Sequence, residues 1–364
     1  MIAIHGGAGD KFKGEECKIC AKAVRNSGGD LIAAIATLER DAAFNCGYGS
    51  NLTASGRVEC EAGYMTSRRL AFGSVGAVTN CVTPSVAARA LAVPFAHVDG
   101  TSCTKQWTLI PPLCLVGDGA NRFCEKIVPN VSIVSSNERL QSEKAKRNFT
   151  KASTRLGNQH QANSRLDTVG GVSIHPDGMV ESCVSSGGLI LKRDGRLGHC
   201  VQFGAGIWSE QRGHTFVGVS LSGCGEALLR TRLAERLADE CFAESSKQLN
   251  NNNDGDEMKD EQTPGIENEF ENIGISLMRR LHAFLIDEFV HSTRLFAFPV
   301  ERRLVGGLIM VWRRDSRQTG AELFVFHNTP QFVFAYSTDG GKSVRRQKST
   351  LQDVQDMLIN SFIL

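Results

Sequence analysis

Apolar and polar positions alternate along this sequence with two different periods, one typical of strands and one typical of helices. Residues 15–26 and 30–40 place apolar side chains at helical spacing, and Asp30 stands where a helix N-cap accepts a backbone hydrogen bond. Residues 1–4 form a short apolar run that predicts a strand, and the glycine-rich residues 5–9 predict a turn. The chain is therefore expected to begin with a strand, a turn and two helices.

The same two periods continue to the C-terminus. Pro84 lies in the first turn of a predicted helix, "PSVAARAL", and "CLVGDGANRFCEK" predicts a strand, a turn and a helix. Two strands after Thr168 are joined by a turn at residues 175–178, and "FVGVSLSGCGEALLRTRLAERLADECFAES" predicts a strand, a glycine turn and one long helix. Further strands are predicted in "RVECEAGYM", "FGSVGAVTN", "LVGGLIMVW", "AELFVFHN" and "QFVFAYS". Many strands with helices between them predict an α+β fold whose sheets are covered by helix layers.

Two polar segments interrupt this pattern. In residues 135–166 the first half is compatible with a helix, whereas the second half has little to bury and is expected to be a flexible linker. Its basic residues fit a solvated face better than a nuclear-import signal, although both interpretations stay open. Residues 250–269 are a low-complexity insert that is expected to be disordered. The whole chain, residues 1–364, is predicted to form one catalytic domain.

Composition narrows the class of protein. The net charge of +2 argues against a dedicated nucleic-acid binder. No run approaches the roughly 20 apolar residues of a membrane span, and the N-terminus does not resemble a signal peptide, so the protein is predicted to act inside the cell without a membrane partner. The twelve cysteines are scattered and are expected to be reduced, and Cys17-x-x-Cys20 lacks a second ligand pair at zinc spacing. We therefore predict no metal and no cofactor.

A threonine stands at the boundary between the polar linker and the first strand of the predicted hairpin. If the bond between Asp167 and Thr168 were cut, the new α-amino group would lie beside the Thr168 hydroxyl. An α-amino group titrates near about 7.7, close to the value that suits a general base at neutral pH. One residue would then supply both nucleophile and base. A threonine before a strand is also common without any chemistry, because β-branched residues favour strands.

An ordered set of segments resembles the threonine-type asparaginase group of the N-terminal-nucleophile hydrolases. The matching segments are "HGGAG" (5–9), "FNCGYGSNL" (44–52), "GRVECEAGYM" (56–65), "FGSVGAV" (72–78), "DTVGGV" (167–172), "VSSGG" (184–188), "GRLGH" (195–199), "SGCGE" (222–226) and "LVGGLIMV" (304–311). Within that group the set is most similar to the threonine aspartases (taspases). The resemblance covers nearly the whole chain except the two polar segments.

The resemblance implies a four-layer αββα sandwich and synthesis as an inactive precursor. It also implies self-cleavage between Asp167 and Thr168 into an α fragment, residues 1–167, and a β fragment, residues 168–364. The two fragments would stay packed together, and two precursors or two αβ units would pair as a homodimer. Whether an ion binds near residues 38–45, where related proteins have a sodium loop, is left open.

The resemblance also assigns roles by position. Thr168 matches the nucleophile, Ser186 the hydroxyl that orients it, and Asn45 a polar group that faces it. The oxyanion hole matches Ser222 and Gly223, and the glycine loop beside the scissile bond matches Gly6 and Gly7. Taken singly, Ser186 reads as a buried serine bonded to the backbone, Asn45 as an Asx-turn residue and Gly223 as a turn glycine; the ordered set favours the functional interpretation.

The predicted substrate site lies in two segments, with Arg196, Leu197, Gly198 and His199 in the first and Cys224 and Gly225 in the second. Arg196 matches the arginine that grips a substrate carboxylate through two charge-assisted hydrogen bonds; without the resemblance it reads as a surface arginine after a turn. Asparaginases and isoaspartyl peptidases usually carry an acidic residue at the position of His199, which neutralises a free α-ammonium group. A peptide substrate cut after an internal aspartate would present a neutral N–H there instead.

These residues predict a threonine endopeptidase that cleaves protein substrates after Asp. The resemblance implies nuclear regulatory proteins of the trithorax and mixed-lineage type as targets, and therefore a location in nucleus and cytoplasm without direct nucleic-acid binding. Two alternatives remain: an isoaspartyl peptidase/L-asparaginase acting on small substrates, and a scaffold that kept the fold and lost the chemistry.

Overall fold

Two β-sheets stacked face to face form the centre of the molecule. The computed structural model describes residues 1–9, 12–96, 110–126, 131–157, 167–253, 266–314, 319–351 and 356–364. The larger sheet has the strand order β12-β11-β1-β5-β6-β2-β3-β4. In chain order its strands are β1 (Ile2–Gly9), β2 (Cys60–Thr66), β3 (Ala71–Val78), β4 (Cys114–Val116), β5 (Val169–Ile174), β6 (Val180–Ser186), β11 (Gln331–Ser337) and β12 (Arg345–Thr350). All its described pairs are antiparallel except β3 with β4.

The second sheet is antiparallel and has the order β13-β10-β9-β8-β7. Its strands are β7 (Ile207–Arg212), β8 (Thr215–Gly223), β9 (Val305–Arg314), β10 (Thr319–His327) and β13 (Leu358–Ile363). Strands β5 and β6 of the larger sheet contact β8, and β1 contacts β9. The middle strands of the two sheets therefore lie against each other.

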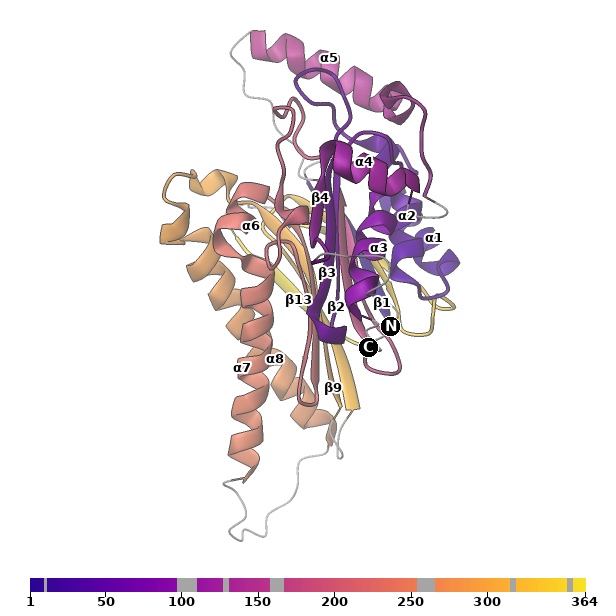
Figure 1. Cartoon of the computed structure of the whole chain (residues 1–364). Helices are drawn as coiled ribbons and strands as arrows, with labels where there is room; N and C mark the ends of the chain where they lie inside the picture. Colours follow the sequence, from indigo (N-terminus) through magenta and orange to yellow (C-terminus); the bar gives the residue numbers. More distant parts are fainter. Residues whose placement is uncertain are drawn as a thin grey trace.

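Helices cover the two outer faces (Figure 1). Three helices, α1 (Glu15–Asn26), α2 (Leu31–Glu39) and α3 (Pro84–Ala96), contact the larger sheet. The helices α7 (Leu233–Asn253) and α8 (Ile266–Leu285) contact the second sheet, and the short α6 (Gly225–Thr231) contacts α7. Two further helices, α4 (Gly117–Lys126) and α5 (Glu143–Gly157), complete the first helix layer and the top of the view. The fold is an α+β sandwich with the layers αββα, as predicted.

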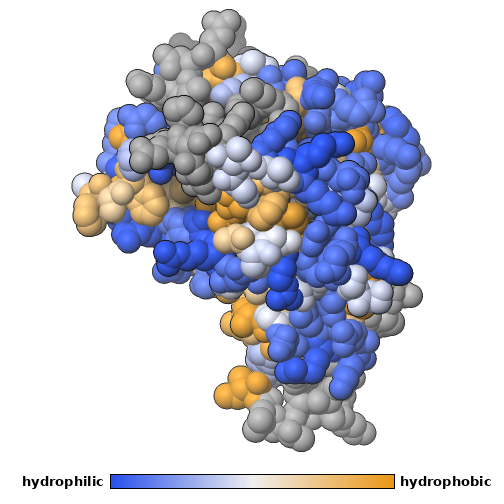
Figure 2. Space-filling model, turned by 90° about the horizontal axis from the view of Figure 1, so that it is seen from above, coloured by the Kyte–Doolittle hydropathy of each residue, from blue (hydrophilic) through white to orange (hydrophobic). Residues whose placement is uncertain are grey.

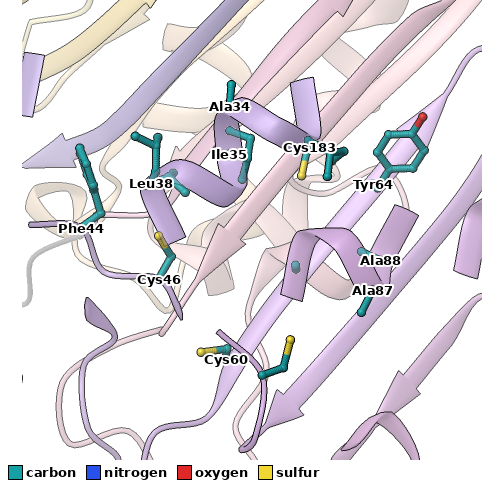
Figure 3. Packing of buried hydrophobic residues seen from close by; sticks show 14 of the residues in the cluster. Ala34, Ile35, Leu38, Phe44, Cys46, Cys60, Tyr64, Ala87, Ala88 and Cys183 are labelled. Carbon is teal, nitrogen blue, oxygen red and sulfur yellow. The ribbon is translucent and has the colours of Figure 1, made fainter. Parts of the chain in front are cut away.

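Close packing between the first helix layer and the larger sheet depends on small residues (Figure 3). Ala34 and Ile35 of α2 and Ala88 of α3 are fully buried there. A Cβ atom on Gly73 of β3 would lie 2.4 Å from the carbonyl oxygen of Ala88. Because only glycine leaves that space, α3 approaches the sheet backbone directly.

Several local predictions are confirmed by the structure. Helix α1 has the predicted bounds, and Asp30 caps α2 by accepting a 3.0 Å hydrogen bond from the Ala33 N–H group. Pro84 begins α3, and the hairpin after Thr168 forms as β5 and β6. These elements depend on local periodicity and local turn chemistry, which the sequence displays directly.

Two local predictions are wrong. Residues 5–9 continue β1 instead of forming a turn, with a bulge between His5 and Gly7 and with Val333 and Phe332 as partners in β11. The predicted single long helix after β8 is divided into α6 and α7 by Arg232, whose φ of 48° is left-handed. In the first case pairing with a distant strand overrides the local glycine signal.

The polar segments are described in part. Helix α5 begins in the first half of residues 135–166, where a helix was compatible with the sequence, and continues to residue 157. The expectation of a flexible linker is therefore wrong for residues 151–157, because Phe149 and Ala152 give this helix an apolar side to bury. Residues 158–166 lie outside the described residues. Helix α7 runs to Asn253 and α8 begins at Ile266, so helical backbone extends into both ends of the 250–269 insert. Residues 254–265 lie outside the described residues.

The described cysteines are all free thiols, and most are buried. Among the described residues no helix is long and apolar enough to cross a membrane. Seen from above, the described surface is mainly hydrophilic, with hydrophobic side chains near its middle and further ones at the left and lower left edges of the view (Figure 2).

A fully buried carboxyl group ends helix α2. Glu39 is 0% exposed and accepts hydrogen bonds from the Ser85 N–H group at 3.0 Å and the Ser85 hydroxyl at 2.7 Å. Burial raises the pKa of Glu39 to about 7, against an ordinary value of 4.5. The folded chain therefore holds a proton at Glu39 over a pH range in which the unfolded chain has released it.

We predict that Glu39 makes the protein less stable as pH rises from 4.5 to about 7. In that window the unfolded state binds fewer protons than the folded state, so the free energy of unfolding falls with rising pH, by up to about 3 kcal/mol. Glu39→Gln should flatten this part of the curve, measured by urea unfolding across the window. Glu143→Gln, at a side chain that is 76% exposed, should leave the curve unchanged. A Glu39→Gln curve parallel to that of the wild type would contradict the assignment.

Candidate active site

Thr168 lies at the wall of a pocket at the start of β5. Thr168 is 4% exposed and Asp167 is 8% exposed, so the boundary between linker and strand is buried. The chain is continuous through both residues, so the Thr168 nitrogen is an amide here. The pocket is lined by Asn45, Glu61, Asp167, Thr168, Ser186, Gly188, Leu189, Lys192, Arg196, Leu197, Gly198, His199, Gly223, Gly225 and Glu226.

The Thr168 hydroxyl is held by the neighbouring strand. It donates a 3.2 Å hydrogen bond to the Ser186 hydroxyl oxygen, which also accepts a 3.0 Å bond from the Gly188 N–H group. Antiparallel pairing of Val169 with Ser185 places Thr168 and Ser186 at the same end of the hairpin. Within the described part of the chain, this is the one side-chain hydrogen bond of the Thr168 hydroxyl, and its partner is neither a histidine nor a carboxylate.

Asn45 stabilises the turn that follows Ser186. Its Nδ2 atom donates to the Gly188 carbonyl oxygen at 2.8 Å, and its Oδ1 atom accepts from the Asn51 N–H group at 2.8 Å. Asn45 lines the pocket, but its two side-chain bonds go to backbone groups, one in this turn and one at Asn51. Its role toward the nucleophile therefore stays a prediction.

The end of β8 supplies backbone to the pocket. Gly223 lines it, and a Cβ atom there would lie 2.4 Å from the Leu304 carbonyl oxygen, so a larger residue would displace the next segment. Ser222 and Cys224 are not among the lining residues. The Ser222 hydroxyl accepts a 3.2 Å hydrogen bond from the Ala8 N–H group, and the Cys224 N–H group donates to Leu304 at 2.8 Å. Both residues thus fix the backbone on either side of Gly223 from outside the pocket, and the oxyanion role of Ser222 and Gly223 stays a prediction.

Gly7 allows the boundary residues to lie against β1. Its φ of 108° is in the left-handed region, and a Cβ atom would lie 2.8 Å from the Asp167 Cα atom and 3.2 Å from the Thr168 carbonyl oxygen. Gly6 faces elsewhere, because its Cβ atom would meet Phe44 and Val333 at 2.7 and 2.8 Å. Of the two glycines, Gly7 is the one that contacts the expected scissile bond.

Arg196 faces the pocket but already holds a carboxylate. Its Nε and Nη2 atoms donate to Glu226 Oε1 at 3.0 and 2.9 Å. Both side chains are partly exposed, at 33% and 40%, so the pair is accessible to solvent. These two bonds use two of the five N–H donors of the guanidinium group, so a substrate carboxylate would compete with Glu226 for this side chain.

His199 is buried and neutral. It is 3% exposed, and its Nε2 atom lies 3.2 Å from the Leu221 carbonyl oxygen, which can only accept a hydrogen bond. Nε2 therefore carries the proton. Burial lowers the pKa of His199, while the nearby Glu61 acts in the opposite direction. As expected, this position brings no negative charge of its own.

Sequence reasoning missed three charged residues of the pocket. Glu61 is 2% exposed and accepts a 2.6 Å hydrogen bond from the Gly198 N–H group. Lys192 is 4% exposed and donates to the Glu59 carbonyl oxygen at 2.8 Å, and Glu226 pairs with Arg196. The one local signal was the alternation in "RVECEAGYM", which gives Glu61 a defined face of β2; the positions of Lys192 and Glu226 depend on the tertiary fold.

Comparisons with known proteins show which family the chain is similar to. A family model described as Asparaginase matches residues 1–263. An isoaspartyl peptidase/L-asparaginase of Danio rerio is 30% identical over 249 residues, which cover 64% of this chain and 73% of the relative. A plant-type L-asparaginase of Pyrobaculum calidifontis is 30% identical over 65% of this chain and 78% of the relative. An isoaspartyl peptidase/L-asparaginase of Homo sapiens is 29% identical over 64% of this chain and 74% of the relative.

Proposed function

Because the chain belongs to the asparaginase family of N-terminal-nucleophile hydrolases, we propose that Thr168 is its nucleophile and that self-cleavage after Asp167 activates it. The observation that carries this proposal is the bond from the Thr168 hydroxyl to Ser186 at the wall of the pocket, with Asp167 pressed against Gly7. The cut would turn residues 1–167 and 168–364 into two fragments of one folded unit.

Self-cleavage begins with attack of the Thr168 hydroxyl oxygen on the Asp167 carbonyl carbon. The amide bond breaks, the nitrogen takes a proton, and an ester joins Asp167 to the Thr168 oxygen. Water then hydrolyses the ester, which releases the Asp167 carboxylate and leaves a free α-amino group on Thr168. Gly7 leaves room for the tetrahedral carbon, since its hydrogen faces Asp167 where other residues carry a Cβ atom.

The mature enzyme repeats this chemistry on a substrate. The α-amino group takes the proton of the Thr168 hydroxyl, whose oxygen attacks the substrate carbonyl. Ser186 orients the hydroxyl, and the Gly223 backbone lies in the pocket where an oxyanion needs N–H donors. The leaving amine takes the proton, and water clears the acyl group from Thr168.

We propose that the substrate is a peptide with an internal aspartate and that cleavage follows it, as in a threonine aspartase (taspase). The aspartate carboxylate would displace Glu226 and bind the Arg196 guanidinium group. The neutral His199 suits the peptide N–H group before the aspartate, since no free ammonium has to be neutralised there. This proposal extends to nuclear regulatory proteins as targets, to a location in nucleus and cytoplasm, and to a homodimer.

A second candidate is an isoaspartyl peptidase/L-asparaginase acting on small substrates. Two observations favour it: the relatives carry that name, and Glu61 brings a carboxyl group into the pocket beside His199. Glu61 could receive a free α-ammonium group. Against this, its Oε2 atom already accepts the short bond from the Gly198 N–H group.

We predict that the purified chain splits between Asp167 and Thr168, and that Thr168→Ala stays whole. Gly7→Ala should slow the split, because the added Cβ atom would lie 2.8 Å from the Asp167 Cα atom. Gly14→Ala is the matched control: Gly14 also has a positive φ, 88°, yet nothing lies within 4 Å of an added Cβ atom. Intact mass measured over days records each rate.

The proposal would be contradicted by an uncut wild-type chain that hydrolyses substrate. In that chain the Thr168 nitrogen would still be an amide, which is not basic enough to activate the hydroxyl. If Gly7→Ala and Gly14→Ala split at the same rate, Gly7 has no role in self-cleavage. The role proposed for Thr168 would be unaffected by that result.

We predict that Arg196→Lys lowers kcat/KM for a peptide with Asp before the cut by about ten- to a hundredfold, the value of a charged hydrogen bond. The same peptide with Asn in place of Asp should be a poor substrate for both enzymes. Arg193→Lys, at an exposed arginine three residues earlier, should behave like the wild type.

Free asparagine and an isoaspartyl dipeptide complete this panel. Ammonia release from asparagine that is faster than cleavage of the Asp peptide would favour the second candidate. Cleaved enzyme that hydrolyses none of the substrates would point to a scaffold without chemistry.

A further inference from the structure

Three side chains of metal-ligand type converge at the end of the pocket. Glu61 comes from β2, whereas His199 and Cys200 are consecutive residues of a 3₁₀ turn, His199–Val201. One ligand atom from each lies within 4.8 Å of the other two. All three residues are buried, with exposures of 2%, 3% and 0%. Across the described ranges, this is the one group of three His, Cys, Asp or Glu residues that meets in this way.

We propose that Glu61, His199 and Cys200 bind a divalent transition-metal ion of the zinc class, and that the bound ion blocks hydrolysis at Thr168. One nitrogen, one sulfur and one carboxylate oxygen form a donor set that suits zinc, with three protein ligands and a fourth position open. Calcium and magnesium need mainly oxygen ligands, so this set disfavours them.

The imidazole of His199 is already oriented as a ligand. Because Nε2 donates its proton to the Leu221 carbonyl oxygen, the lone pair is on Nδ1. A Cβ atom on Gly225 would lie 3.2 Å from Nδ1, and Gly225 lines the pocket. Nδ1 therefore lies next to a residue of the pocket lining and has no proton of its own. Metal-binding histidines commonly have this kind of support from a backbone carbonyl on the other ring nitrogen.

The carboxyl group of Glu61 is positioned in a similar way. Its Oε2 atom accepts the 2.6 Å bond from the Gly198 N–H group, which fixes the side chain and leaves Oε1 to coordinate. The Cys200 thiol interacts with the same carboxyl group, and burial raises the pKa of Cys200 well above its ordinary value. Cys200 is thus a thiol before binding. When the ion binds, the sulfur forms the metal bond and its proton leaves to solvent.

The site shares its pocket with the nucleophile. Glu61 and His199 line the same pocket as Thr168 and Ser186, so an ion there would occupy space and present positive charge where a substrate has to bind. Metal binding itself does not rest on the proposed function, whereas the inhibition does.

The binding test uses the Thr168→Ala chain, which can neither split nor catalyse, and Co²⁺ as a spectroscopic probe. We expect one equivalent of Co²⁺ to give a thiolate-to-cobalt charge-transfer band and the intense visible bands of a tetrahedral site, both removed by one equivalent of Zn²⁺. Cys200→Ser should lose the charge-transfer band and weaken Zn²⁺ binding by about a hundredfold or more. Cys241→Ser, at an equally buried free cysteine in α7, should keep both.

Glu61→Gln is a second variant for the case in which Cys200→Ser does not fold, as judged by circular dichroism. It should keep the charge-transfer band but weaken Zn²⁺ binding by roughly ten- to a hundredfold. Absence of the band in the Thr168→Ala chain, or its persistence in Cys200→Ser, overturns the metal site.

The inhibition test uses the self-cleaved enzyme and the Asp peptide. We expect Zn²⁺ to lower kcat/KM in a way that a chelator reverses, and the ratio of rates with and without Zn²⁺ to approach one in Cys200→Ser. Comparing ratios within each variant removes differences in basal activity. If the cobalt bands appear but Zn²⁺ does not reduce hydrolysis, the metal site stands and the inhibition is wrong. If the self-cleaved enzyme hydrolyses nothing even without metal, the proposed function is wrong and the cobalt result is unaffected.

Discussion

The hydrogen bond between Thr168 and Ser186 depends on the register of one hairpin. Strand β5 pairs with β1 on one side and with β6 on the other, so the residue before β5 cannot shift along the sheet without moving three strands. A one-residue slip would turn Thr168 to the opposite face and away from Ser186. The buried sheet thus holds Thr168 and Ser186 in one fixed relative position.

The pocket beside this hairpin brings together polar groups of different kinds. His199 stays neutral because it is buried, and Arg196 is paired with Glu226 at the partly exposed side of the pocket. Glu61 is held by the Gly198 N–H group in the same pocket. The pocket therefore combines one ion-paired carboxylate, one neutral imidazole and one hydrogen-bonded carboxyl group.

Local features of the fold could be predicted from the sequence because they depend on neighbours along the chain. The helical spacing of α1, the cap at Asp30 and the turn between β5 and β6 were all of this kind. The error at residues 5–9 had the opposite cause. Glycines that read as a turn continue β1 because β11, more than 300 residues away, pairs with them, and the bulge after His5 absorbs their irregular backbone.

By itself, the sequence determined the family, the layer order and the position of the threonine at the end of a polar segment, because ordered motifs and periodicity are written along the chain. Only the tertiary structure decided that Gly7 rather than Gly6 faces Asp167, that Glu226 already holds Arg196, and that Glu61 lies beside His199 and Cys200. Such contacts join strands and turns far apart in sequence, and side-chain direction across two sheets follows from their packing, which no local pattern encodes.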